Sequence, residues 1–141
     1  MENEKNLKID KLAELYARVE ADFTLNEGNV MEKSLRAPIL YNKWMMEFTK
    51  RSLELKQKMV NLEKIAGRKT KYFKEEYNRD LKVGEIEKYL FTDDEYVNIY
   101  RQTRELEVIC AYLEGITKKM SNLGFDVKNY IELKKFLNGS N

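Results

Sequence analysis

Positive charge and aromatic rings alternate in one short segment, between residues 64 and 74. In sites for single-stranded nucleic acid, cations follow the phosphates while each ring offers a face on which any base can stack. The segment therefore predicts a surface for single-stranded nucleic acid. We assign to this surface Lys64, Arg68, Lys69, Lys71, Tyr72, Phe73 and Lys74.

The charge of the chain is concentrated around this segment. Residues 50–71 hold eight Lys or Arg against two Glu, which gives +6 locally, whereas the whole chain carries +2. The other residues therefore sum to −4. A strongly basic face attracts a polyanion. The alternative is that these cations only solvate the outer face of a helix, while the aromatic rings complete its core.

Other kinds of functional site find little support in the sequence. No His is present, which removes the commonest general base and the commonest metal ligand. The residues around Gly67 lack the glycine spacing of a phosphate-binding loop, and residues 92–95 lack the ligand spacing of a calcium loop. We therefore expect neither an enzyme nor a cofactor. The single Cys110 lies in an apolar pattern typical of a buried thiol.

The basic segment lies at the end of a long amphipathic pattern. From Tyr41 onward, positions in steps of four and three are apolar except at Ser52 and Lys69. Such a seam is typical of one face of a helix. Phe73 falls on the seam and fits the core, so Tyr72 is the better candidate for base stacking.

This seam predicts a helix over residues 38–77. Pro38 fits the first helical turn, where its missing amide hydrogen costs nothing. The alternative is a helix that already runs from Val30 and is kinked at the proline. The lone Trp44 lies inside the helix in either case, and we interpret it as a core anchor.

The segments on either side of the long helix are shorter. Residues 1–28 predict an N-terminal arm with a helix capped by Asp10, either docked on the rest of the chain or free to bind a partner. Residues 78–91 are weakly patterned and predict a plain connector. If that connector moves, Arg79 and Lys82 are free to reach a ligand.

The C-terminal third predicts two further helices, over residues 92–139. Thr92 and Glu95 have the spacing of a capping box at the start of a helix. Gly124 suits a left-handed cap at its end. A short helix from Val127 to Leu137 follows.

These elements predict an all-α protein with two long amphipathic helices, shorter helices and a single domain over residues 1–141. The apolar faces are wider than one small monomer can cover, which favours a homo-oligomer. We assign the contacts between subunits to the C-terminal helices, at Ile99, Leu106, Ile109, Leu113, Ile116, Met120, Leu123 and Phe125.

Four features together resemble the UvsY family of recombination mediator proteins from T-even-like bacteriophages. They are the length, the Tyr41-Asn42-Lys43-Trp44 entry to the long helix, the basic segment that closes on Tyr72 and Phe73, and Gly124-Phe125 with Lys128 and Phe136 behind it. The family pattern has a Lys, any residue and an Arg before the two aromatics. Here Gly67 and Lys69 hold those positions, while Arg68 and Lys71 add charge nearby.

The resemblance implies a ring-forming helical protein, a heptamer, that binds single-stranded DNA. It further implies contacts with the phage single-stranded-DNA-binding protein and the loading of a RecA-like recombinase onto the strand, in recombination, repair and replication. It implies no cofactor. The chain also lacks a secretory signal and any apolar run of about 18 residues, so we expect no membrane partner and a cytoplasmic location in the infected host.

A second hypothesis competes with this one. The heptad seam and the modest total charge are also typical of a helical structural protein or adaptor that binds only protein partners. Such a protein assembles without any affinity for nucleic acid, so the two hypotheses differ in one measurable property.

Overall fold

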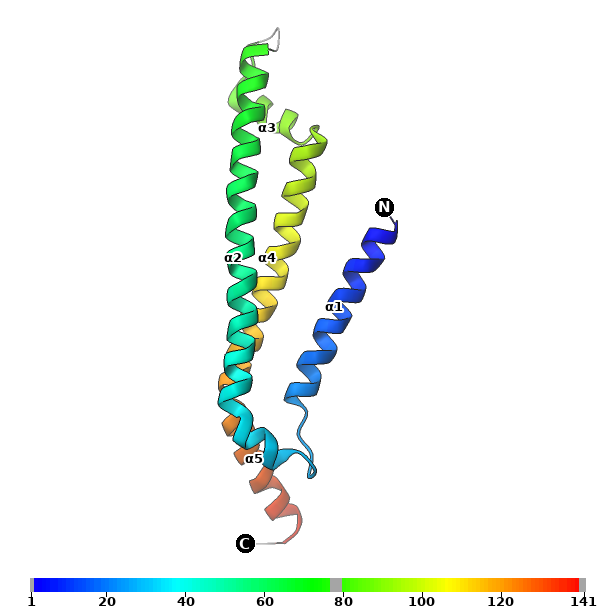
Figure 1. Cartoon of the computed structure of the whole chain (residues 1–141), viewed down its shortest axis with the longest axis vertical. Helices are drawn as coiled ribbons and strands as arrows, with labels where there is room; N and C mark the ends of the chain where they lie inside the picture. The colour runs from blue at the N-terminus through cyan, green and yellow to red at the C-terminus, as the bar shows by residue number, and fades with distance from the viewer. Residues whose placement is uncertain (1, 77–79, 140–141) are drawn as a thin grey trace. The chain divides into compact units, whose positions relative to one another are not determined.

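A computed structural model describes residues 2–76 and 80–139. Over these ranges the chain forms five α-helices and no strand, which confirms the all-α prediction. The helices are α1 (Glu2–Phe23), α2 (Val30–Glu76), α3 (Val83–Leu90), α4 (Asp94–Ser121) and α5 (Leu123–Leu137) (Figure 1). They form two compact units. Unit 1 comprises residues 1–46 and 114–141, and unit 2 comprises residues 47–113, so α2 and α4 contribute to both. The prediction of a single domain stays a prediction.

Unit 1 is built around Trp44, whose side chain is fully buried as predicted. Its indole Nε1 donates a hydrogen bond to Oδ2 of Asp22, at 2.8 Å. The Thr117 hydroxyl donates to the carbonyl oxygen of Trp44 at 3.4 Å. A buried indole N–H needs a hydrogen-bond acceptor, and Asp22 supplies it here. The apolar core of unit 1 consists of Val19, Leu40, Trp44, Ile116, Met120, Leu123 and Val127.

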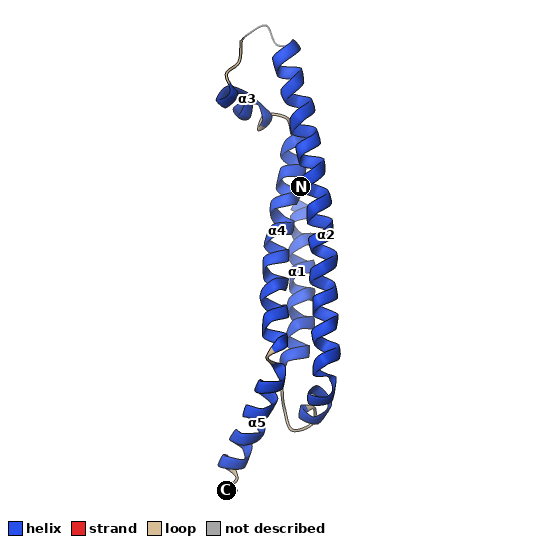
Figure 2. Ribbon diagram, turned by 90° about the vertical axis from the view of Figure 1, so that its left-hand side faces the viewer, coloured by secondary structure: helices blue, strands red, loops and turns tan. Residues whose placement is uncertain are grey.

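Unit 2 is an antiparallel helix pair, in which α2 and α4 lie side by side and α3 lies near the end where α2 stops and α4 starts (Figure 2). Lys58 of α2 donates to Oε1 of Gln102 on α4 at 2.9 Å, which ties the two helices together. Cys110 is buried, as predicted. The buried apolar residues are Phe73, Ile86, Leu90, Tyr96, Leu106, Cys110 and Leu113.

Two helices begin earlier than the sequence predicted: α1 begins before Asp10, and α2 begins before residue 38. α1 runs from Glu2, so Asp10 lies inside it and caps nothing. The Glu, Lys and Leu residues before Asp10 are strong helix formers, which accounts for the earlier start. α2 begins at Val30 and carries Pro38 in its interior, which confirms the second of the two alternatives. The ribbon bends in the first turns of α2 (Figure 1), as expected of a proline that removes a hydrogen bond.

The predicted helix ends in the second half of the chain were wrong in three places. Asp93 caps α4 instead of Thr92, because its Oδ1 accepts the backbone N–H of Tyr96 at 2.9 Å. Gly124 has no left-handed conformation and lies inside α5, which begins at Leu123 instead of Val127. Part of the expected connector is the helix α3. Arg79 lies outside the described residues.

Most of the side chains assigned to subunit contacts are already covered within one chain. Leu106, Leu113, Ile116, Met120 and Leu123 are buried in the cores of their own units, while Ile99 and Ile109 are half-buried. The assignment of subunit contacts to these side chains therefore stays a prediction, although one chain already covers most of them. Phe125 differs from the rest, with 68% of its surface exposed. Among the described residues, no helix is both long enough and apolar enough to cross a membrane.

Candidate nucleic-acid surface

The C-terminal part of α2 places basic side chains and the ring of Tyr72 on one face of the helix. Lys64, Arg68 and Lys71 follow each other at spacings of four and three, which places them on one face. Tyr72 lies one turn beyond Arg68 and is 53% exposed. An exposed ring therefore borders a row of cations.

Phe73, the neighbour of Tyr72 in sequence, is buried and belongs to the core of unit 2. It packs in a cluster with Leu90 and Tyr96, and its ring centroid is 5.6 Å from that of Tyr89. The structure therefore corrects the assignment of Phe73 to a base-stacking surface, since the packed core covers its ring. Phe73 also contacts Tyr72 edge to face at 5.6 Å, so the buried ring supports the exposed one.

Two of the assigned cations form ion pairs with carboxylates at the start of α4. Nη2 of Arg68 lies 2.8 Å from Oε1 of Glu95. Nζ of Lys69 lies 3.0 Å from Oδ2 of Asp93 and 3.4 Å from Oε2 of Glu95. The charges of Arg68 and Lys69 are thus balanced within the chain.

These ion pairs shift the titration of two groups. The pKa of Asp93 is lowered, chiefly because its carboxylate accepts the backbone N–H of Tyr96, and secondly because Lys69 donates to it. The pKa of Lys69 is raised, chiefly by its hydrogen bond to Asp93, with a smaller contribution from Glu95. Both shifts favour the charged forms, so the pairing persists at neutral pH.

The other three assigned cations differ from this pair. Lys64, Lys71 and Lys74 are exposed, and no ion pair joins them to any side chain within residues 10–76 and 80–139, where the structure describes side chains. Lys69 is only partly exposed by comparison. The charge available to an external anion therefore resides mainly on Lys64, Lys71 and Lys74, on the same helical segment as Tyr72.

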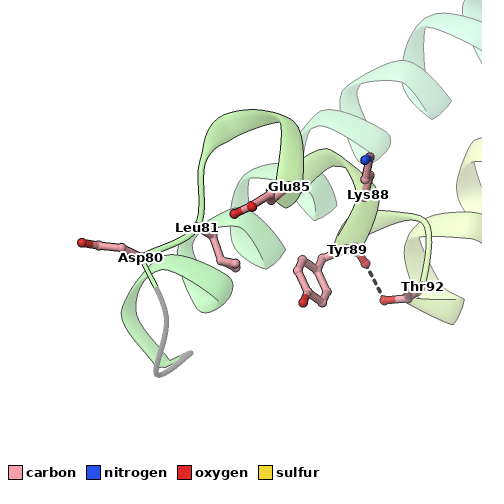
Figure 3. Close-up of a pocket in the computed structure, with 6 residues that line it drawn as sticks. All are labelled: Asp80, Leu81, Glu85, Lys88, Tyr89 and Thr92. Carbon is pink, nitrogen blue, oxygen red and sulfur yellow. Dashed lines mark hydrogen bonds between the residues drawn. The ribbon is translucent and has the colours of Figure 1, made fainter.

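Two shallow pockets lie in this part of unit 2. One, of about 390 Å³, is lined by Arg68, Lys69, Tyr72, Phe73, Thr92 and Asp93. The other has a similar volume and is lined by Asp80, Leu81, Glu85, Lys88, Tyr89 and Thr92 (Figure 3).

The pocket in Figure 3 suits an anion poorly. Leu81 and Tyr89 point toward the same space, and the Thr92 hydroxyl donates to the carbonyl oxygen of Tyr89 at 2.6 Å. Two carboxylates and one ammonium group belong to its lining, which leaves the wall acidic. Glu85 is also engaged locally, since its Oε2 accepts the backbone N–H of Lys82 at 3.0 Å. The pocket beside Tyr72 is the better candidate for a nucleotide.

The sequence pattern did not indicate the partners of Arg68 and Lys69. Glu95 was assigned only to a capping box with Thr92. The contact of Asp93 and Glu95 with cations some 25 residues away depends on how α2 and α4 are aligned along each other, and that alignment is invisible in a sequence pattern. Across the described residues, no group of three or more acidic, Cys or His side chains could hold a metal ion.

The fold and the exposed cation and ring surface define an all-helical protein with a surface suited to single-stranded nucleic acid. A family model described as "Recombination, repair and ssDNA binding protein UvsY" matches residues 18–140. The chain belongs to the UvsY family, which confirms the resemblance seen in the sequence. Membership assigns it a role in recombination, repair and single-stranded DNA binding.

Solved structures agree with this assignment at the level of the fold. A crystal structure of the bacteriophage T4 recombination mediator protein UvsY, in lattice type IV, has a TM-score of 0.77 at 14% identity and covers 89% of this chain and 97% of its own. The lattice type II structure has the same TM-score at 13% identity, with 90% and 97% covered. A search of curated protein sequences found no match.

Proposed function

We propose that this protein is a recombination mediator that binds single-stranded DNA through the outer face of α2. It helps to load a RecA-like recombinase onto strands covered by the single-stranded-DNA-binding protein, in recombination, repair and recombination-dependent replication. The observation that carries the proposal is the half-exposed ring of Tyr72 on the same helical segment as the exposed side chains of Lys64, Lys71 and Lys74. Family membership supports it independently.

The geometry of this face suits a flexible polyanion. Lys64 and Lys71 are seven residues apart, and at 1.5 Å per residue their Cα atoms are separated by about 10 Å along the helix. Lysines act as point charges on flexible stems, so they can follow phosphates without fixing a base sequence. The ring of Tyr72 offers stacking to any base. The surface therefore predicts binding that is strong at low salt and tolerant of sequence.

We further propose that the protein acts as a homo-oligomer, a ring and by family resemblance a heptamer. Since the predicted contact residues of α4 are largely buried within one chain, the exposed apolar side chains of α5 are better candidates. They are Phe125, Ile131, Leu133, Phe136 and Leu137. A ring presents several copies of the α2 face to one strand, which raises the total affinity without any new contact.

The mediator function needs no bond chemistry and no cofactor. It shifts which protein occupies the strand, in the cytoplasm of the infected bacterium. The rate at which the recombinase hydrolyses ATP on DNA covered by the single-strand-binding protein reports this shift. We expect the unaltered chain to shorten the lag before hydrolysis starts, and an unchanged lag would contradict the mediator role.

DNA binding is tested by titrating a fluorescent oligonucleotide, single-stranded or duplex, at several salt concentrations. Changing Lys64, Lys71 and Lys74 together to Gln should weaken single-strand binding. It should also flatten the slope of log affinity against log salt by about two units per engaged subunit, since each phosphate contact contributes about 0.7. Lys119, Lys128 and Lys135 are exposed cations of unit 1, and their change to Gln is the matched control.

The ring is tested separately. Tyr72→Ala should lower the affinity by about 1–3 kcal/mol, the value of one stacked base, and leave the salt slope nearly fixed. If the control variant at Lys119, Lys128 and Lys135 lost as much affinity as the α2 lysine variant, the charges would act only at long range. Unchanged binding in both the lysine variant and Tyr72→Ala would place the site elsewhere.

The exposed apolar face of α5 also supports the alternative of an adaptor that binds only proteins. An adaptor would show the same assembly in light scattering. It would bind neither single-stranded nor duplex DNA, so the titration above separates the two functions.

A further inference from the structure

Glu95 holds two cations at once. Its Oε1 accepts from Nη2 of Arg68 at 2.8 Å, and its Oε2 lies 3.4 Å from Nζ of Lys69. The two oxygens of one carboxylate thus bridge two neighbouring cations of α2. The two non-bridging oxygens of a phosphodiester can make the same pair of contacts, because they also carry one negative charge over two acceptors.

Asp93 plays a different part from Glu95. Its Oδ1 accepts the backbone N–H of Tyr96 at 2.9 Å and its Oδ2 pairs with Lys69 at 3.0 Å. As the cap of α4 it is fixed in place, and its side chain is largely covered. Glu95 is half exposed, and its described polar contacts are those with Arg68 and Lys69. Glu95 can therefore swing away while Asp93 keeps Lys69 in position.

The same two cations and Tyr72 line one pocket of about 390 Å³. A phosphate bound by Arg68 and Lys69 would accordingly lie next to a ring that can hold the adjoining base. Arg68 and Lys69 are thus balanced by carboxylates in the free chain, yet they lie next to the exposed ring of Tyr72.

We propose that Arg68 and Lys69 form a phosphate subsite for single-stranded DNA, and that Glu95 occupies this subsite in the free protein as a built-in competitor. The inference rests on the proposed DNA-binding function of the α2 face and adds a step to it. The strand has to displace one carboxylate before the subsite is filled. Glu95 thereby sets the affinity, and keeps Arg68 and Lys69 from holding other anions.

Exposed ion pairs are weak enough for this exchange. Each changes an equilibrium by a factor of about 1.5 to 5, and Glu95 forms two of them. Glu95→Gln should therefore raise the affinity for single-stranded DNA about twofold to 25-fold. It should also steepen the salt slope by up to about 1.4 units per engaged subunit, because Glu95 then no longer balances the two cations that meet phosphates.

The test is a fluorescence titration of an oligothymidine with the full chain. Glu87→Gln is the matched control, because Glu87 is an exposed residue of unit 2 and its change alters the net charge equally. A second comparison repeats Glu95→Gln in a chain that carries Arg68→Gln and Lys69→Gln. There the gain should vanish, since the competitor and the subsite act as one unit. Circular dichroism verifies that every variant keeps its helix content.

Two results would overturn the inference. One is an equal effect of Glu95→Gln and Glu87→Gln, and the other is an undiminished gain in the chain without Arg68 and Lys69. Either result leaves the proposed function intact if the unaltered chain binds the oligonucleotide through Lys64, Lys71 and Lys74. If neither the unaltered chain nor the Glu95→Gln variant binds, the function and the subsite both fail.

Discussion

Each unit of the molecule combines a ring, cations and a carboxylate, yet the two combinations differ in exposure. In unit 1, Arg18 and Lys43 lie over the faces of Trp44, at 5.5 and 5.2 Å from its ring centroid, and Asp22 binds both Lys43 and the indole N–H. The ring is fully buried. In unit 2 the ring of Tyr72 is half exposed beside cations.

The difference shows that residue type alone does not define a nucleic-acid site. Around Trp44, Asp22 accepts from both Lys43 and the indole N–H, and the ring is fully buried, so the cluster stabilises the fold. The ring of Tyr72 is half exposed, and Lys64, Lys71 and Lys74 form no ion pair with a described side chain, so their charge is available to an external partner. Only the second cluster can exchange its contacts for those of a ligand.

The largest loss of stability should come from replacing the buried ring of Trp44. Trp44→Ala should lower the free energy of unfolding by about 3–5 kcal/mol, because it removes a large core side chain and leaves a cavity. Trp44→Phe should cost about 1.5–3 kcal/mol, the value of a hydrogen bond to a charged acceptor, here Asp22. Urea titration followed by circular dichroism measures both. Tyr72→Ala should leave the stability within about 0.5 kcal/mol, and a loss as large as that of Trp44→Ala would contradict the contrast.

A smaller effect should follow pH, through the hydrogen bond that Asp93 accepts from the backbone N–H of Tyr96 and through its ion pair with Lys69. The pKa of Asp93 is lowered in the folded chain, so the stability it contributes is present above about pH 4 and is lost as the pH falls through that lowered value. The pKa of Lys69 is raised, so its contribution is present below about pH 10.4 and is lost at higher pH.

Thermal unfolding at a series of pH values tests this window. Asn caps a helix about as well as Asp, so Asp93→Asn keeps the cap of α4 and removes the charge. The unaltered chain should be more stable than the variant at neutral pH, and the difference should shrink below about pH 4. A difference that stays constant down to pH 2 would show that the carboxylate charge does not contribute.

The sequence predicted those parts of the structure that depend on local periodicity. The heptad seam indicated the long helix and the core position of Phe73, because side chains at steps of three and four share one face of any helix. The burial of Trp44 was inferred from its residue type. Helix ends were less predictable. A single hydrogen bond from Tyr96 to Asp93 moved the cap by one residue, and α2 tolerated Pro38 in its interior.

The residue types of the candidate site were predictable from the sequence, but the ion pairs of Arg68 and Lys69 were not. The sequence placed Lys64, Lys71 and Tyr72 on a helix, and their exposure agrees with that prediction. It could not show that Glu95 neutralises Arg68, because the contact depends on the alignment of two helices. For the same reason the covering of Leu113 within one chain was missed, and most of the side chains assigned to subunit contacts are already covered in one chain.

The central claim, that single-stranded DNA binds at the open ring and not at the buried one, is tested most directly by photo-crosslinking. An oligonucleotide that carries a photoreactive thymine is bound to the full chain and irradiated, and mass spectrometry locates the adducts. We expect adducts on Tyr72, with none on Trp44 or Phe73, and we expect Tyr72→Ala to remove them. Adducts confined to unit 1, or an unchanged yield in the Tyr72→Ala variant, would contradict the account.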